Sequence, residues 1–246
     1  MNVRDKVVIV TGASEGIGLA AARLLAADGA RLALAARSEE NLRTLAAELE
    51  RSGTDVAAFP TDLRREDQTR RMVEQAFARF GRIDVLINNA GQGMAGFLEH
   101  APVEDYLRLV ELNLFGPVWA MQAVIPLMRR AGGGLILNVS SMVSKMHIPG
   151  LGYYASTKAA LNVLSETARY ELAGDNIRVI AVFPRATATD FGKNSRGDQA
   201  LRQRQRSGAH PSAMIVDSAE HVARCIGRAI DLEPAEQHMD DPGTGR

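Results

Sequence analysis

Residues 11–18 read Thr-Gly-Ala-Ser-Glu-Gly-Ile-Gly and directly follow the apolar run 7–10. Three glycines allow this turn to bend tightly and to approach a bound group closely. Residues 17–28 follow with helical periodicity, so the turn lies between a buried strand and a helix. The start of such a helix offers unpaired N–H groups and a positive dipole end to a phosphate. The turn therefore predicts dinucleotide binding, although G-x-x-x-G-x-G differs from the usual G-x-G-x-x-G. A purely structural turn is the alternative.

Short apolar runs and longer helical patterns alternate along the rest of the chain. We expect strands at 6–10, 31–35, 56–59, 85–88, 135–139 and 177–183, and helices at 17–28, 39–51, 67–80, 103–130, 154–173 and 218–230. Continuous apolar strands separated by helices are typical of a parallel sheet covered on both faces. The sequence therefore predicts an α/β protein with a single doubly wound, Rossmann-type domain. Gly116-Pro117 is expected to bend the helix 103–130.

The domain is expected to span residues 1–232 and to be followed by a polar tail at 233–246. Within the domain, residues 185–217 are polar and lack periodicity, which predicts a mobile flap. Residues 231–246 contain no apolar β run, so the sequence leaves a seventh strand in doubt and makes the tail a candidate for disorder.

Composition excludes several classes of protein. The 246 residues include 29 basic and 29 acidic side chains, which argues against a nucleic acid or an anionic membrane as the main partner. No apolar run approaches the roughly 18 residues of a membrane span. A single cysteine, Cys225, excludes an internal disulfide framework and fits a reducing compartment. The histidines show no metal-ligand spacing, so we expect a cytoplasmic protein without a metal.

The end of the second expected strand bears on the type of dinucleotide. An acid there would bind the 2′-hydroxyl of NAD, whereas an arginine accommodates the 2′-phosphate of NADP. The chain has Ala36, Arg37 and Ser38 at this point. Arg37 offers a bidentate fork to a phosphate, and Ser38 either adds a hydroxyl or caps the next helix. NADP(H) is therefore favoured over NAD(H), and a solvated surface arginine is the alternative.

Tyr154 and Lys158 form a candidate acid/base pair. They lie four residues apart on an expected helix, about 400° of rotation, so they share a face, whereas Tyr153 points elsewhere. A phenol needs its pKa of about 10 lowered to exchange protons near neutral pH. A nearby ammonium favours the phenolate. An ordinary amphipathic helix start has the same spacing and is the alternative.

Ser140 and Ser141 follow the expected strand 135–139. Residues at the carboxyl ends of strands line the crevice of this fold, and a serine there can stabilise charge on a carbonyl oxygen. Periodicity does not choose between the two serines. Apolar residues of the expected crevice mouth are typical of a pocket for a moderately apolar small molecule. They are Met94, Phe97, Met142, Met146, Ile148 and Leu151.

Taken together, these residues resemble the short-chain dehydrogenase/reductase family, in its common single-domain branch, from about residue 6 to residue 230. Five motifs occur in the family's order: the turn 11–18, Asp62, the sequence N-N-A-G at 88–91, Asn113 with Gly116, and Tyr154-x-x-x-Lys158. The family's catalytic serine lies thirteen positions before its tyrosine, which selects Ser141. The resemblance implies hydride transfer between a nicotinamide cofactor and a ketone or secondary alcohol. A non-catalytic dinucleotide-binding regulator of the same fold and an NAD-dependent dehydrogenase are the alternatives.

The resemblance also implies a role for each site residue. Tyr154 exchanges the proton and Ser141 holds the substrate oxygen. Lys158 lowers the pKa of Tyr154 and binds the nicotinamide ribose, and Asn113 holds a water. The cofactor-binding set is Gly12, Ser14, Gly16, Ile17, Gly18, Arg37, Ser38, Asp62, Leu63, Asn89, Ala90, Gly91, Tyr154, Lys158, Pro184, Thr187 and Thr189.

The chain departs from the family pattern in two places. Arg185 follows Pro184 where the family has glycine, so the flap is expected to leave its strand differently. Glu15 stands where some NADP-dependent members carry a basic residue. We expect a homodimer or higher homo-oligomer through the helices 103–130 and 154–173, whereas the doubtful seventh strand puts tetramer contacts at that edge in doubt.

Overall fold

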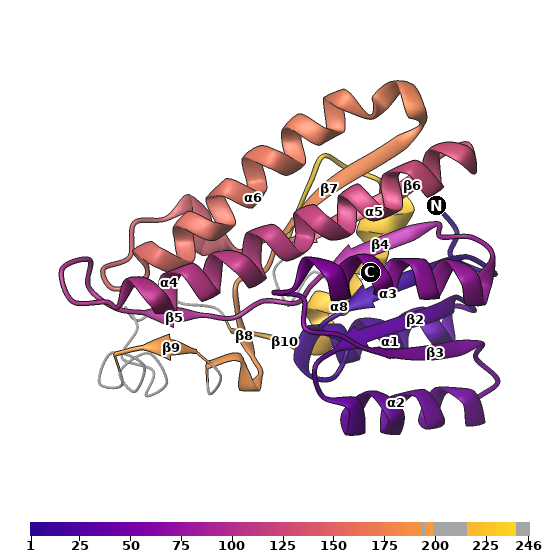
Figure 1. Cartoon of the computed structure of the whole chain (residues 1–246), viewed down its shortest axis with the longest axis horizontal. Helices are drawn as coiled ribbons and strands as arrows, with labels where there is room; N and C mark the ends of the chain where they lie inside the picture. Colours follow the sequence, from indigo (N-terminus) through magenta and orange to yellow (C-terminus); the bar gives the residue numbers. More distant parts are fainter. Residues whose placement is uncertain (193–194, 199–215, 240–246) are drawn as a thin grey trace.

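Parallel strands form the central sheet in the residues that the computed structural model describes, which are 1–192, 195–198 and 216–239. From edge to edge, the seven strands are β3 (Val56–Pro60), β2 (Arg31–Ala36), β1 (Val7–Thr11), β4 (Val85–Asn88), β6 (Gly134–Val139), β7 (Ile177–Phe183) and β11 (Glu236–His238). All neighbouring pairs run parallel, and the order changes direction between β1 and β4, as in doubly wound folds (Figure 1). The predicted α/β, Rossmann-type class is confirmed.

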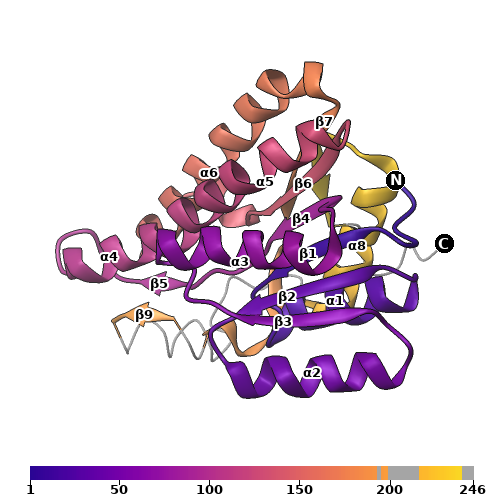
Figure 2. The same ribbon diagram turned by 45° about the vertical axis from the view of Figure 1, so that its right-hand side comes forward.

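Helices cover both faces of the sheet (Figure 2). One face carries α1 (Gly16–Ala27), α2 (Glu39–Arg51) and α8 (Ala219–Leu232), and the other carries α3 (Glu66–Phe80), α5 (Gly116–Arg130) and α6 (Gly152–Glu171). Strand alternation divides the core, since Val8 packs in the first layer and the neighbouring Ile9 in the second. Cys225 of α8 is fully buried in the first core.

Strand β11 corrects our doubt about a seventh strand. Its side chains are polar, so a hydrophobic pattern could not reveal it. Backbone pairing with β7 holds the strand instead, and the His238 ring stacks on Phe183 with centroids 4.9 Å apart. The sheet therefore extends past residue 232 to His238, and residues 240–246 of the expected tail lie outside the described residues.

The expected helix 103–130 consists of three parts: α4 (Val103–Val110), a π-helical turn η1 (Glu111–Phe115), and α5. The irregularity therefore precedes the expected bend at Gly116-Pro117. Gly116 is needed for close packing, because a Cβ there would lie 2.7 Å from the carbonyl oxygen of Leu63. Among the described residues, Val103–Arg130 is the one helix long and apolar enough to cross a membrane by length and composition, and 44% of its most apolar window is buried. Core helices of soluble proteins pass the same test.

The expected flap 185–217 lies partly outside the described residues. Its described parts are β8 (Ala186–Ala188), the short helix η4 (Asp190–Gly192), β9 (Arg196–Gly197) and the start of β10 (Val216–Ser218). β8 pairs with β10, and β9 pairs with β5 (Met94–Ala95). Arg185 has no positive φ, so an arginine fits this backbone without the strain that a glycine position would impose.

Candidate active site

The turn between β1 and α1 needs each of its glycines for a steric reason. Gly12 and Gly16 have φ of +66° and +55°, in the left-handed region. Gly18 has no room for a side chain, because a Cβ would lie 2.2 Å from the Gly12 carbonyl oxygen and 2.5 Å from Asn89 Nδ2. The first turn of α1 can therefore pack directly against the loop after β4.

The change Gly18→Ala should destabilise the protein by about 1–3 kcal/mol, because the added methyl group must displace backbone atoms. The matched control is Gly152→Ala, since a Cβ at Gly152, the first residue of α6, meets nothing within 4 Å. Urea unfolding of both variants measures the difference. Equal stability of the two variants would contradict the steric account.

The loop after β4 is bonded to this turn. Thr11 Oγ1 accepts hydrogen bonds from the backbone N–H groups of Asn89 at 2.9 Å and Ala90 at 3.1 Å, and it donates to the Ile87 carbonyl. The Asn89 side chain donates to the carbonyl oxygens of Thr11 and Gly12 at 2.9 and 3.3 Å. These bonds fix the two loops that the resemblance assigns to the cofactor.

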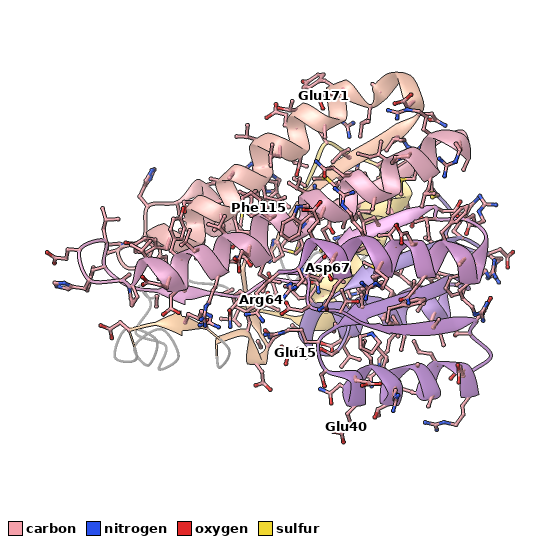
Figure 3. All side chains as sticks on the ribbon, viewed as in Figure 1. Glu15, Glu40, Arg64, Asp67, Phe115 and Glu171 are labelled. Atoms are coloured by element: carbon pink, nitrogen blue, oxygen red, sulfur yellow. The ribbon has the colours of Figure 1, made fainter. Side chains whose placement is uncertain are left out.

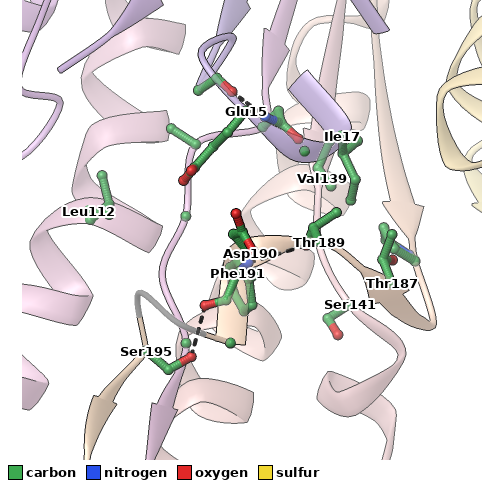
Figure 4. A pocket seen from close by; sticks show the side chains of 18 of the residues that line it. Glu15, Ile17, Leu112, Val139, Ser141, Thr187, Thr189, Asp190, Phe191 and Ser195 are labelled. Atoms are coloured by element: carbon green, nitrogen blue, oxygen red, sulfur yellow. Dashed lines mark hydrogen bonds between the residues drawn. The ribbon is translucent and has the colours of Figure 1, made fainter. Parts of the chain in front are cut away.

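A pocket of about 710 Å³ opens at the carboxyl ends of the strands (Figure 4). Most of the expected site residues line it: Gly12, Ser14, Gly16, Ile17, Arg37, Ser38, Leu63, Asn89, Ala90, Gly91, Ser141, Tyr154, Lys158, Pro184, Thr187 and Thr189. Gly18, Asp62 and Asn113 are not part of the lining. The volume falls in the range of roughly 300–1,000 Å³ typical of small-molecule sites.

Sequence reasoning missed a further group of lining residues. They include Glu15, Asn41, Thr61, Gly93, Val143, Asp190, Phe191, Gly192 and Ser195. Several of these lie in the segment after β8, which has no periodicity from which to place them. Of the apolar loop residues expected at the mouth, Met94 and Leu151 line the pocket, whereas Phe97 and Met146 are 46% and 42% exposed.

Asp62 is already paired within the protein. Arg64 Nε donates to its Oδ1 at 2.9 Å, and Arg64 Nη2 donates to its Oδ2 at 2.6 Å. These bonds hold the pKa of Asp62 below its ordinary value, although partial burial opposes the shift. The spacing Asp-x-Arg was available in the sequence as a signal of this pair.

Ser141, and not Ser140, faces Tyr154. Ser140 also lines the pocket, but its hydroxyl donates to Asn162 Oδ1 at 2.5 Å. The hydroxyl of Ser141 is hydrogen-bonded to Tyr154, and its Oγ also accepts from the Val143 N–H at 3.3 Å. The structure thus brings together the serine that the resemblance selected and the expected tyrosine.

Asn162 supports this turn and was missed from the sequence. Its Nδ2 donates to Ser144 Oγ at 2.9 Å, and Ser144 Oγ donates to the Ser141 carbonyl at 2.6 Å. Asn162 follows Lys158 by four residues, as Lys158 follows Tyr154. The same helical spacing that predicted the acid/base pair could therefore have identified a third residue on this stripe of α6.

Burial dominates the titration of the pair. It raises the pKa of Tyr154 to about 12, against the opposing effect of the hydrogen bond with Ser141. It lowers the pKa of Lys158 to about 8, and Lys158 Nζ donates to the Val139 carbonyl at 2.8 Å. The net shift of Tyr154 is away from neutral pH, so the expected lowering by Lys158 stays a prediction for the cofactor-bound protein.

Asn113 lies in the π-helical turn behind the pocket. Its Oδ1 accepts from the Gln92 N–H at 2.9 Å, while Nδ2 donates to the Gln92 carbonyl at 2.9 Å and to Thr157 Oγ1 at 3.2 Å. A Cβ at Gly91 would lie 3.3 Å from Asn113 Oδ1 and 3.5 Å from Lys158 Nζ. Asn113 is thus close to the lysine, and the expected water stays a prediction.

Comparisons with known proteins agree with this architecture. The family model described as short chain dehydrogenase matches residues 6–200. An uncharacterized oxidoreductase of Staphylococcus saprophyticus is 35% identical over 243 residues, which cover 98% of this chain and 95% of that protein. A short chain dehydrogenase from Burkholderia cenocepacia, solved in complex with NADP, has a TM-score of 0.83 at 28% identity over 98% of each chain. A 7α-hydroxysteroid dehydrogenase, solved with NADH and 7-oxo glycochenodeoxycholic acid, has a TM-score of 0.86 at 28% identity over 99% of this chain and 96% of its own.

Proposed function

Because the chain belongs to the short-chain dehydrogenase/reductase family and is an oxidoreductase, we propose that it transfers a hydride between NADP(H) and a moderately apolar ketone or secondary alcohol. The observation that carries this proposal is that Ser141, Tyr154 and Lys158 all line the pocket that the glycine turn also lines. A binding module has no need of a partly buried tyrosine and a buried lysine that line the same pocket.

The residues of the pocket suit a nicotinamide dinucleotide. Gly12 and Gly16 leave the first turn of α1 open to a pyrophosphate. Thr187, Thr189 and Leu63, which the resemblance assigns to the cofactor, line the same pocket. When bound, the nicotinamide supplies or accepts the hydride, while the proton is handled by the protein.

Tyr154 is the general acid/base in this proposal. In the reductive direction its hydroxyl gives a proton to the substrate oxygen, which the Ser141 hydroxyl holds. With a pKa near 12, the phenol needs positive charge beside it to form the phenolate. The Lys158 ammonium provides such a charge, and its own pKa of about 8 keeps it mostly protonated at neutral pH.

The rival reading is a dinucleotide-binding regulator without turnover. Fold alone does not separate the two functions. The test is a panel of ketones, hydroxysteroids, sugars and acyl thioester ketones, followed at the nicotinamide absorbance. Turnover of a panel member supports the enzyme. Cofactor binding without turnover of any class supports the regulator.

The preference for NADP(H) rests on Arg37, which is exposed at the pocket rim. Ser38 caps α2, because its hydroxyl accepts from the Asn41 N–H at 3.4 Å, and so it fills the second role considered for it. Arg37 would then carry most of the recognition of a 2′-phosphate. An NAD-dependent dehydrogenase is the alternative at this position.

The change Arg37→Ala is expected to raise the Kd of NADP(H) by roughly 10–100-fold, because it removes a charged hydrogen-bond donor to the phosphate. The Kd of NAD(H) should stay within about twofold. Arg43→Ala is the matched control, since Arg43 lies on α2 and is 74% exposed beside Glu39. Calorimetric titration of both cofactors measures the effect. An equal loss for NADP(H) and NAD(H) would show that Arg37 does not read the phosphate.

We propose that the chain forms a homodimer through a surface made by α4, α5 and α6. Leu107 of α4 is 56% exposed, and Val163 and Tyr170 of α6 are 65% and 75% exposed. Phe115, at the end of η1 between α4 and α5, is 45% exposed (labelled in Figure 3). Large exposed apolar side chains on neighbouring helices favour burial against a second copy. With β11 formed, the reason to doubt contacts at that sheet edge also disappears. We keep the cytoplasm as the proposed location, without nucleic-acid or membrane partners.

A further inference from the structure

The segment after β7 is held at its base by an ion pair between Arg185 and Asp217. Arg185 Nε and Nη2 donate to the two oxygens of Asp217 at 3.0 and 2.9 Å. The Asp217 side chain is completely buried, and His221 Nε2 lies 3.7 Å from its Oδ1. β8 and β10 pair directly beside this contact. The loss of its partner would leave the buried carboxylate with an uncompensated charge, which is strongly destabilising. The Arg185–Asp217 ion pair, which we call the base clamp, therefore links residues 32 positions apart.

The base clamp supports one wall of the pocket. Thr187 Oγ1 donates to the Arg185 carbonyl at 3.1 Å, and Thr189 follows two residues later (Figure 4). The Thr189 methyl carbon lies 3.2 Å from the position that a Cβ on Gly16 would take. The residues next to the base clamp therefore pack on the glycine turn, which is the proposed cofactor side.

A second arginine holds the same segment at another point. Arg196 Nη1 donates to Asp105 Oδ1 at 2.9 Å, and Arg196 Nε donates to Gln92 Oε1 at 3.1 Å. The Arg196 N–H also donates to the Gly93 carbonyl at 2.9 Å, within the pairing of β9 with β5. Gly197 has φ +86°, and a Cβ there would lie 2.0 Å from the Ala95 carbonyl oxygen. We call the Arg196–Asp105 ion pair the tip clamp. It holds residues 195–198 in close contact with β5.

Phe191 lies between these two clamps and against the catalytic tyrosine. Its ring centroid is 5.8 Å from that of Tyr154, at an angle of 60°. Ser195 Oγ donates to the Phe191 carbonyl at 3.1 Å, and a Cβ on Gly93 would lie 3.0 Å from the Phe191 ring (Figure 4). The ring remains 38% exposed and lines the pocket. Phe191 is therefore an aromatic side chain of the pocket lining that lies next to the Tyr154 ring.

We propose that the two arginine clamps have different roles, one in cofactor binding and the other in substrate selection. The base clamp Arg185–Asp217 positions Thr187 and Thr189 for the cofactor. The tip clamp Arg196–Asp105 holds Phe191 beside Tyr154, where Phe191 selects carbonyl compounds with a flat apolar group next to the C=O. This inference rests on the proposed function and specifies its substrate class.

The experiment compares Arg185→Met with Arg196→Met, so that each variant is a control for the other. Arg23→Met serves both, because Arg23 forms a similar two-bond fork with Glu48 on the surface at 2.8 Å. Kd of NADP(H) and kcat/KM for acetophenone and for 2-butanone are measured in each. Arg185→Met should raise the Kd at least about tenfold, since it leaves a buried carboxylate without its main partner.

Arg196→Met should leave that Kd within about twofold and lower the preference for acetophenone over 2-butanone by roughly 2–10-fold, the worth of one aromatic contact. Phe191→Leu should reproduce this loss of preference. If both arginine variants change Kd and preference alike, the division is wrong. Because Arg185→Met could fail to fold, the double change Arg185→Met/Asp217→Met removes both charges. Normal cofactor affinity in that folded variant would overturn the base clamp.

A third measurement needs no turnover. In a Phe191→Cys variant, the thiol should react faster with a maleimide when Arg196→Met is added, and not when Arg23→Met is added. Cys225 is buried and provides the slow internal reference. An unchanged rate would overturn the tip clamp. Absence of turnover on every carbonyl compound would instead overturn the proposed function. The cofactor Kd values and the thiol reaction rates would still test the roles of the two clamps.

Discussion

The change Tyr154→Phe is expected to lower kcat by roughly 10²–10⁴-fold, the usual contribution of a positioned general acid/base. Only the hydroxyl is lost. The ring keeps its contact with Phe191 and the helix keeps its position, so the Kd of NADP(H) should stay within about twofold. Initial rates at the nicotinamide absorbance and calorimetric titration of the cofactor measure the two quantities separately.

Tyr153→Phe is the matched control, because the side chain of Tyr153 points in a different direction from that of Tyr154. Tyr153 donates its hydroxyl hydrogen to the Leu98 carbonyl at 2.8 Å and packs on Tyr106, away from Ser141. This control should keep turnover within about twofold of wild type, as expected for a partly exposed neutral hydrogen bond. Full turnover by Tyr154→Phe would refute the assignment of the acid/base.

Sequence patterns were sufficient where one local rule decided the structure. The strands at 85–88 and 177–183 and the helix at 39–51 begin and end as predicted. The two strands are mostly apolar and buried on both faces, with Arg178 as the one partly buried residue. In the helix, a serine cap and an amphipathic stripe mark the limits. The presence of Tyr154 and Lys158 in one pocket was predictable for the same reason, since helical spacing brings the two residues to one face.

Sequence patterns were insufficient where the structure depends on a contact between segments that are far apart in the chain. β11 is polar and forms only because β7 offers an open edge. The placement of Phe191 depends on Arg196, Asp105 and Gly93, which are far apart in the chain. The role of Arg185 likewise needs Asp217, and no periodicity links the two residues. On the segment after β7, the resemblance supplied Pro184, Thr187 and Thr189, which line the pocket, whereas no pattern in the sequence placed Phe191 there.

Replacement of the buried Lys158 is expected to have a second large effect, on the free energy of unfolding as well as on turnover. Lys158 is 3% exposed, and burial lowers its pKa from 10.5 to about 8. Between these pH values the unfolded chain binds the proton more readily than the folded one. The burial penalty is therefore fully present below pH 8 and disappears as the pH rises past 10.5. By the constant of 1.36 kcal/mol per pKa unit, the penalty is about 3 kcal/mol at pH 7.

The change Lys158→Met should accordingly raise the free energy of unfolding of the cofactor-free protein by up to about 3 kcal/mol at pH 7 and by much less at pH 10.5. It should also reduce kcat at least about 10²-fold, because the phenolate of Tyr154 loses its cation. Tyr154 titrates in both proteins, so the comparison of variant with wild type isolates the lysine.

Urea unfolding at the two pH values measures this difference, with Lys6→Met as the control at a lysine that is 35% exposed. That control should change stability by less than about 1 kcal/mol at either pH. A loss of stability in Lys158→Met at pH 7 would mean that the bond from Nζ to the Val139 carbonyl outweighs the burial penalty. The lysine would then stabilise the fold. A gain at pH 7 that fades at high pH, together with lost turnover, would mean instead that the protein gives up stability to hold a cation beside Tyr154.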